Sequence, residues 1–152
     1  MRAVNVTGLL FARQRLWEVS ERVPTFDFYD WVLGVAAVAV DERVVDIGCG
    51  NGAYLERLPN AVGVDLSLGM LTAAHRRAPN PLLQADVTAL PCRDATFDVV
   101  LAARMLYHVA DRASAARELR RVVTAGGRCV VVTNSDSNQR QLVSLVERAV
   151  GH

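Results

Sequence analysis

Residues 44–53, VVDIGCGNGA, decide the fold of this protein. The run VVDI is short and β-branched, which is typical of a buried strand, and it ends at Gly48. The glycines at 48, 50 and 52 permit a tight turn and let a ligand approach the backbone closely. A helix is predicted over residues 53–58, and its first N–H groups favour an anionic group. The stretch therefore predicts a strand, a ligand-binding loop and a helix.

The rest of the chain repeats this alternation of strands and helices. Short apolar runs predict further strands, and amphipathic or capped segments predict helices. The expected strands are 43–47, 61–65, 82–86, 97–102 and 128–133, and the expected helices are 9–23, 26–38, 53–58, 68–77, 113–123 and 139–150. Nearly continuous apolar strands that alternate with helices indicate an α/β fold with a mainly parallel sheet, covered on both faces.

Length and composition narrow the class of protein. The chain has 152 residues, of which 51% are hydrophobic and 22% charged, so we expect one globular domain and exclude a disordered tail or a collagen-like fibre. The formal net charge of +1 gives no electrostatic footprint for nucleic acid or for an anionic membrane. We divide the domain into an N-terminal helical cap, 1–40, and a ligand-binding core, 41–152.

Cysteine spacing and hydropathy bear on metal binding and localisation. The cysteines at 49, 92 and 129 are too widely spaced for a C-x-x-C metal or redox motif, so no metal site is predicted. The apolar stretch 6–12 is too short and interrupted for a signal peptide, and the run 31–40 falls well short of the ~20 residues that span a bilayer. We therefore expect a cytoplasmic protein with no membrane partner.

Two acidic residues accompany the glycine loop. Asp46 lies two residues before the first glycine, and Asp65 ends the next predicted strand, where a carboxylate can accept both hydroxyls of a ribose. Gly48, Gly50 and Ala53 also satisfy the dinucleotide fingerprint G-x-G-x-x-G/A. On these residues alone, NAD and any other adenosine ligand compete on equal terms.

Five segments, in order from about residue 43 to 134, resemble the class I S-adenosylmethionine-dependent methyltransferases, in the small-molecule branch of the methyltransferase domain 11 type. The segments are VVDIGCGNG (44–52), VGVDLS (62–67) followed by ML (70–71), QADV (84–87) followed by LP (90–91), FDVV (97–100) leading to MLYHV (105–109), and RELRRVV (117–123) before GG (126–127) and the last strand. The resemblance implies a Rossmann-like, doubly wound sheet of about five strands in the order 3-2-1-4-5, preceded by N-terminal helices.

The resemblance also implies roles for individual residues. The loop around the methionine portion of S-adenosyl-L-methionine is formed by Gly48, Cys49, Gly50 and Gly52, and the ribose is bound by Asp65. Asp86 accepts a hydrogen bond from the adenine amino group, the Val87 N–H donates one to the adenine ring, and the side chains of Leu66 and Met70 pack against the adenine. The backbone of Ala102 lies beside the reacting methyl group. For several of these positions a structural role competes: Leu66 and Met70 are equally well interpreted as core residues, Asp86 as a turn residue, and Cys49 as a small filler.

Asp46 distinguishes the two cofactors. The methionine portion carries an ammonium group, which needs an acceptor, and Asp46 supplies one directly or through water. The pyrophosphate of a dinucleotide in the same place is repelled by this carboxylate. S-adenosyl-L-methionine is therefore ranked above NAD.

Methyl transfer from a sulfonium needs little more than alignment of the nucleophile, so an obvious catalytic set is not expected. Tyr107 and His108 are the candidate catalysts, because an imidazole can take a proton from an oxygen or nitrogen acceptor. A packing role competes for both. Tyr29 is a candidate to close over the cofactor, and Arg104 to pair with a carboxylate of a substrate.

The chain differs from the family pattern in its length. The family usually adds two strands after the fifth strand and its helix, and no residues after Val150 supply them, so strands 6 and 7 are expected to be absent. A second copy or a partner is then expected to cover the open sheet edge. We predict methyl transfer to an O, N or C nucleophile of a small molecule. A non-catalytic S-adenosylmethionine-binding module or truncated remnant is the alternative, and an NAD-dependent oxidoreductase ranks last.

Overall fold

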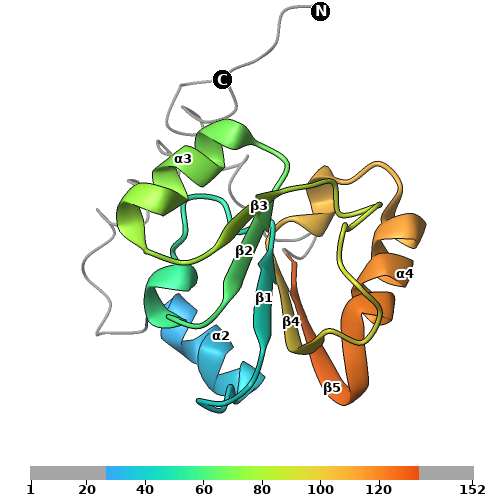
Figure 1. Ribbon diagram of the computed structural model, residues 1–152, viewed down its shortest axis with the longest axis horizontal. Helices are drawn as coiled ribbons and strands as arrows, with labels where there is room; N and C mark the ends of the chain where they lie inside the picture. The colour runs from blue at the N-terminus through green and yellow to red at the C-terminus, as the bar shows by residue number, and fades with distance from the viewer. Residues whose placement is uncertain (1–26, 134–152) are drawn as a thin grey trace, which may run out of the picture.

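The computed structural model describes residues 27–133 (Figure 1). Its elements, in chain order, are α2 (Phe28–Ala36), β1 (Val44–Ile47), the 3-10 helix η1 (Leu55–Arg57), β2 (Val62–Asp65), α3 (Leu68–Arg77), β3 (Leu82–Gln84), β4 (Phe97–Ala103), the 3-10 helix η2 (Leu106–His108), α4 (Arg112–Val122) and β5 (Val123–Val132). The helices predicted over 9–23 and 139–150 lie outside the described residues.

The five strands form one sheet in the order β3-β2-β1-β4-β5, and every pair of neighbours is parallel. Val45 of β1 lies opposite Val62 of β2 on one side and Val100 of β4 on the other. The α/β class and the strand order 3-2-1-4-5 predicted from the sequence are confirmed. The sheet is wholly parallel in the described part of the chain, where a mainly parallel one was expected.

Helices cover the two faces of the sheet because side chains alternate along each strand. Val44 points into a core that it shares with α2, η1 and α3, whereas Val45 and Ile47 point into a second core that they share with α4. Figure 1 shows α2 and α4 on opposite sides of the sheet. The topology places α3 and α4 on opposite faces, since α3 lies in the right-handed crossover from β2 to β3 and α4 in the one from β4 to β5. α2 precedes β1 and packs on the same core as α3.

Side-chain caps set the starts of the three α-helices. The Asp27 carboxylate accepts from the N–H groups of Tyr29 and Asp30, so α2 begins at residue 28 and not at 26 as predicted. Ser67 caps α3, and Asp111 caps α4. Each cap satisfies backbone N–H groups that a helix end leaves without a partner.

The prediction of a helix over residues 53–58 is wrong. The segment forms a turn and the single 3-10 turn η1. Gly52, just before the segment, has a left-handed backbone, φ +81°, and Pro59 comes directly after it. Only the six residues 53–58 remain between two positions that do not continue a helix. The glycine loop therefore leads into a short turn and does not open a helix.

The boundary between the last helix and the last strand also differs from the prediction. β5 begins at Val123, directly after α4, and residues 126–127 lie inside the strand, where the pairing with β4 shifts its register. A Cβ at Gly127 would come within 2.7 Å of the Asp98 carbonyl oxygen. These glycines allow close strand pairing at an irregularity and do not end the helix. β3 likewise ends at residue 84 and not at 86.

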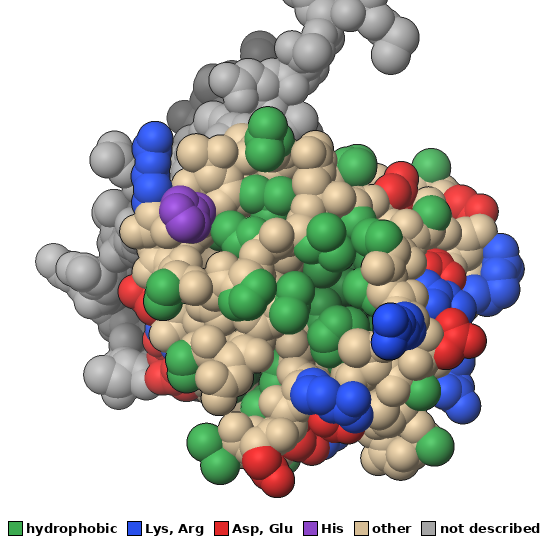
Figure 2. Space-filling model, in the orientation of Figure 1, with side chains coloured by type: hydrophobic (Ala, Val, Ile, Leu, Met, Phe, Trp, Pro, Cys, Tyr) green, Lys and Arg blue, Asp and Glu red, His purple; other side chains and the backbone are tan. Residues whose placement is uncertain are grey.

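The surface between α3 and α4 is apolar. Figure 2 shows hydrophobic side chains gathered in the middle of this face, with charged side chains toward its margin. No helix within residues 27–133 is long and apolar enough to cross a membrane.

Candidate active site

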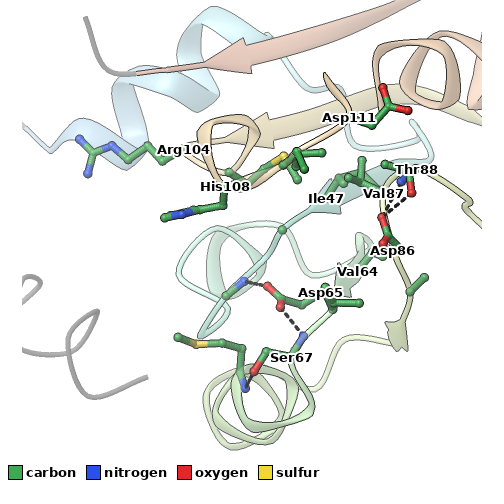
Figure 3. A pocket seen from close by; sticks show the side chains of 18 residues that line it. Ile47, Val64, Asp65, Ser67, Asp86, Val87, Thr88, Arg104, His108 and Asp111 are labelled. Atoms are coloured by element: carbon green, nitrogen blue, oxygen red, sulfur yellow. Dashed lines mark hydrogen bonds between the residues drawn. The ribbon is translucent and has the colours of Figure 1, made fainter. Parts of the chain in front are cut away.

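A pocket of about 910 Å³ opens at the carboxyl ends of the strands (Figure 3). The order of the strands reverses between β1 and β4, so the segments that leave these two strands diverge and open a crevice. The pocket is lined by Ile47, Gly48, Gly50, Val64, Asp65, Leu66, Ser67, Met70, Ala85, Asp86, Val87, Thr88, Arg104, Met105, His108, Val109, Ala110 and Asp111. The structure thus brings together most of the predicted site residues, from β1, β2, α3 and the segments after β3 and β4.

The glycine loop forms the wall of the pocket beside β1. Gly48 has φ +71°, and a Cβ at this position would lie 2.6 Å from Cβ of Met105, in the segment after β4. Gly50 also has a positive φ, +55°, but a Cβ there would meet nothing within 4 Å. Backbone conformation therefore favours glycine at both positions, and close packing requires it only at Gly48.

Asp65 ends β2 and faces the pocket. Its Oδ2 accepts from the Gly50 N–H at 2.9 Å, and its Oδ1 accepts from the Ser67 N–H at 2.8 Å, as the dashed lines in Figure 3 show. Asp65 therefore uses one backbone N–H of the glycine loop, which is then not available to a ligand in this arrangement. The carboxylate ties the glycine loop to the start of α3 and still lines the pocket.

The segment after β3 forms another wall. Asp86 is exposed, and its Oδ1 accepts from both the N–H and the hydroxyl of Thr88, at 2.8 and 2.7 Å. These bonds lower the pKa of the Asp86 carboxyl, so it is ionised at neutral pH. Val87 is buried against the core. In the segment after β2, Leu66 is 64% exposed while Met70 is buried, so Leu66 offers apolar surface to a ligand and Met70 belongs to the core as well.

Asp46 lies beneath the glycine loop, 1% exposed, and does not line the pocket. Burial, reinforced by the negative charge of Asp65, raises the pKa of Asp46 to about 7. Its Oδ2 has no hydrogen-bond partner among residues 27–133. Such an atom is costly to bury, so Asp46 is suited to receive a positively charged donor.

Three further predicted residues are buried and do not line the pocket. Cys49 and Gly52 pack inside the loop: burial raises the pKa of the Cys49 thiol, and a Cβ at Gly52 would lie 3.1 Å from Cα of Ala74 in α3. Ala102 of β4 is fully buried in the core next to α4. The side chains of Cys49 and Ala102 and the bare backbone of Gly52 thus have packing roles in this structure.

The candidate catalysts follow β4. His108, in η2, is exposed at the pocket, while Tyr107 does not line it and packs its ring 4.3 Å from the imidazole. Arg104 has a left-handed backbone, φ +57°, which is uncommon for a residue with a side chain and occurs at functional sites. Its guanidinium lies 4.1 Å above the ring of Phe28 in α2. Figure 3 shows Arg104 and His108 pointing away from Asp65 and Asp86.

Sequence reasoning missed four residues at or near the site. Ser67, Thr88 and Asp111 line the pocket, and each lies next to a turn or a helix start, which is a signal for a cap but not for a ligand. Tyr54, two residues after the last glycine of the loop, is 7% exposed, and its hydroxyl has no hydrogen-bond partner within the described chain. No local pattern marks Tyr54, since an aromatic residue in this position is typical of a core.

Metal chemistry has no evident ligands in the part of the chain that the structure describes. Within residues 27–133, no group of three or more His, Cys, Asp or Glu side chains is placed to hold a metal ion.

Comparison with known proteins shows which family this chain matches. A family of methyltransferase domains matches residues 45–131. The chain is 34% identical to the 27-O-demethylrifamycin SV methyltransferase of Amycolatopsis mediterranei over 111 residues, which cover 65% of this chain and 41% of the relative. It is 40% identical to the demethylmenaquinone methyltransferase of Corynebacterium kroppenstedtii over 94 residues, which cover 59% and 41%. The chain thus spans less than half the length of these curated relatives.

Solved structures share the fold. The YcgJ protein of Bacillus subtilis aligns with a TM-score of 0.67 at 24% identity, over 79% of this chain and 57% of that protein.

Proposed function

The chain belongs to the family of methyltransferase domains, and from this premise we propose that it binds S-adenosyl-L-methionine and transfers the methyl group to a nucleophilic O, N or C atom of a small molecule. The observation that supports the cofactor most strongly is the pair Asp46 and Asp65 on the two sides of the glycine loop. One carboxylate is buried with an unpartnered oxygen, and the other faces the pocket.

The residues present fit this cofactor. Its amino-acid portion carries an ammonium group, and the unpartnered Oδ2 of Asp46 is an acceptor for it. A dinucleotide would bring a pyrophosphate to the glycine loop, next to two carboxylates whose charges already repel each other. Asp46 therefore favours the methyl donor over NAD.

Each wall of the pocket takes one part of the ligand in this proposal. Asp65 binds the ribose hydroxyls, and Asp86 with the Val87 N–H binds the polar edge of the adenine. Leu66 and Met70 contact the adenine ring, and the loop of Gly48, Cys49, Gly50 and Gly52 surrounds the amino-acid portion. The backbone of Ala102 marks the end of β4 nearest the reacting carbon.

When bound, S-adenosyl-L-methionine supplies a methyl group on a positively charged sulfur, which a nucleophile displaces. The chain then has three tasks: to hold the acceptor in line, to exclude water and, for a protonated acceptor, to remove a proton. Ile47, Val64 and Met105 line the pocket with apolar surface. An imidazole nitrogen of His108 accepts the proton, and the ring of Tyr107 supports that imidazole.

A non-catalytic binding module is the second candidate function. It is favoured by the length of the match, because the chain covers less than half of its curated relatives and part of an acceptor site can lie in what they have in addition. This candidate predicts the same cofactor pocket without turnover.

Two experiments separate these functions. Calorimetric titration should show S-adenosylhomocysteine binding and NAD not binding; the reverse result would refute the assignment of the cofactor. Incubation with a labelled methyl donor and a panel of phenols, amines and carboxylic acids should then show transfer. Binding without transfer to any acceptor would favour the non-catalytic module.

A further inference from the structure

The charged side chains around the pocket are separated by sign. Asp86 and Asp111 lie on one side of it, and the side chains of Arg104 and His108 lie on the other (Figure 3). Of the described residues that line the pocket, Arg104 alone carries a permanent positive charge. An anionic group of a ligand is therefore attracted to the Arg104 side of the pocket and repelled from the acidic side.

Contacts from β5 and α2 hold Arg104 in place. Its backbone N–H donates to the carbonyl oxygen of Val132 in β5 at 2.7 Å, and its backbone is left-handed, φ +57°. Its guanidinium carbon lies 4.1 Å from the centre of the Phe28 ring in α2. A left-handed backbone is unfavourable for a residue with a side chain and persists where the surrounding structure fixes it. The position of the cation is thus set before a ligand binds.

The stack on Phe28 is compatible with binding of a carboxylate. Stacking uses the face of a guanidinium, whereas its N–H donors lie in the plane and match a carboxylate with two parallel hydrogen bonds. The acids on either side of Phe28, Asp27 and Asp30, pair with Arg57 at 2.7 and 2.9 Å, so these carboxylates of α2 already have a cation. Arg104 is half-buried, so water screens its charge less than that of a surface arginine.

The rest of the pocket favours a singly charged anion over a phosphate. Asp65 and Asp86 both line the pocket, and they repel a doubly charged group more strongly than a carboxylate. Met105, directly after Arg104, lines the pocket with apolar surface, which suits the carbon skeleton of a small acid. The pocket is therefore suited to a carboxylic acid bound through one cation.

His108 lies on the same side of the pocket as Arg104 (Figure 3). In the proposed function its imidazole accepts a proton from the acceptor. A molecule whose carboxylate is bound by Arg104 can present a second group, an O–H or an N–H, to this imidazole.

We propose that the methyl acceptor is a small carboxylic acid that also carries an O–H or N–H group, and that the Arg104 guanidinium binds its carboxylate. The proposal rests on the proposed function and narrows its substrate from small molecules in general to this class. Arg104 then selects the acceptor by charge and does not contribute to binding of the cofactor.

The test uses three phenols of similar size that differ in charge at neutral pH. 4-Hydroxyphenylacetate is anionic, 4-hydroxyphenylacetamide is neutral and tyramine is cationic. Each is titrated calorimetrically into the complex with S-adenosylhomocysteine, and transfer from a labelled methyl donor is measured in parallel. The variants are Arg104→Gln, which removes the charge, and Arg104→Lys, which keeps it. Arg120→Gln is the matched control, because Arg120 is an exposed arginine of α4 that does not line the pocket.

The acid should bind the wild-type complex about tenfold more tightly than the amide, with tyramine weakest, and methyl transfer should follow the same order. Arg104→Gln should remove the difference between acid and amide and leave the affinity for S-adenosylhomocysteine unchanged. Arg104→Lys should restore part of the difference, and Arg120→Gln should behave as the wild type.

Three results would overturn the proposal. The first is an acid that binds or reacts no better than the amide in the wild type. The second is equal weakening of all three phenols by Arg104→Gln, which indicates a structural role. The third is weaker binding of S-adenosylhomocysteine to Arg104→Gln, which assigns Arg104 to the cofactor. If the wild type does not bind S-adenosylhomocysteine at all, the proposed function itself has failed.

Discussion

The two ends of the parallel sheet differ in how their charged side chains are paired. At the amino end, Arg43 forms a bidentate ion pair with Asp98, and Arg128 pairs with Glu42 at 2.6 Å. The hydrogen bonds from Arg128 hold the pKa of Glu42 at about 2, below its ordinary value. At the carboxyl end, burial raises the pKa of Asp46 to about 7.

This contrast shows what each end of the sheet does. Paired charges at the amino end join α2, β1, β4 and β5, because Arg128 also donates to the carbonyl oxygens of Ala36 and Ala37 at the end of α2. The carboxyl end instead keeps a buried carboxylate with one unpartnered oxygen, and two glycines with positive φ line the pocket there. Strain and unsatisfied polar atoms gathered at one end are typical of a binding site, which the rest of the fold must stabilise.

The largest expected effect is on the glycine loop. Gly48→Ala adds a methyl group 2.6 Å from Cβ of Met105 at a positive φ, so we expect a loss of ~2–4 kcal/mol in the free energy of unfolding. Gly50→Ala is the matched control, because it has the same backbone strain without the contact, and we expect about 1 kcal/mol. Urea unfolding measures both. Equal losses in the two variants would show that the contact with Met105 does not matter.

Asp65→Ala tests the pocket side of the loop. Loss of a charged partner for two ribose hydroxyls should weaken S-adenosylhomocysteine by ~1–3 kcal/mol, measured by calorimetry. The variant also frees the N–H groups of Gly50 and Ser67, so thermal melts must accompany the titration. Asp41→Ala, an exposed acid near the amino end, should bind normally. Normal binding by Asp65→Ala would refute the position of the ribose.

Asp46→Asn should stabilise the free protein at pH 8 by ~1–2 kcal/mol. The folded pKa of Asp46, about 7, lies above its ordinary value, so the folded state binds more protons than the unfolded state between about pH 4 and pH 7. Wild-type stability therefore falls as pH rises through this range, and the variant lacks that fall. Urea unfolding at pH 4.5 and pH 8 measures the difference, which should be small at pH 4.5. If Asp46→Asn is less stable than the wild type at pH 8, the buried charge of Asp46 does not destabilise the folded protein.

The affinity for S-adenosylhomocysteine should rise about tenfold between pH 6 and pH 8. Only ionised Asp46 binds an ammonium group, and its pKa of about 7 in the free protein lies inside this interval. 5′-Methylthioadenosine, which lacks the ammonium, is the control and should show no such rise. If the affinity for both ligands is the same at pH 6 and pH 8, Asp46 does not bind the ammonium group.

The smallest expected effect is at the amino end. Arg128→Gln removes the pair with Glu42 and the bonds to the end of α2, and should lower the melting temperature by a few degrees. S-adenosylhomocysteine should bind as to the wild type, because no residue of this network lines the pocket. Weakened binding would mean that the two ends of the sheet are coupled.

The sequence by itself determined the strand that ends at Gly48, the turn after it and the position of Asp65 at the end of β2. These features depend on local patterns: apolar runs bounded by glycine, alternation with helices, and motifs of fixed spacing. The helix over residues 68–77 was predicted with its observed bounds for the same reason. The order of the strands came from the resemblance to a known family and not from these patterns.

Only the tertiary structure decided what surrounds each polar atom. The burial of Asp46 with one unpartnered oxygen and the direction of the Arg104 side chain depend on β1, β4 and α2, which are far apart in sequence. The lost helix over residues 53–58 and the early start of β5 have the same origin, because packing of Gly52 against α3 and pairing of β5 with β4 override local preference. A sequence pattern specifies which groups the chain carries, whereas burial and partners come from segments that meet only in the folded chain.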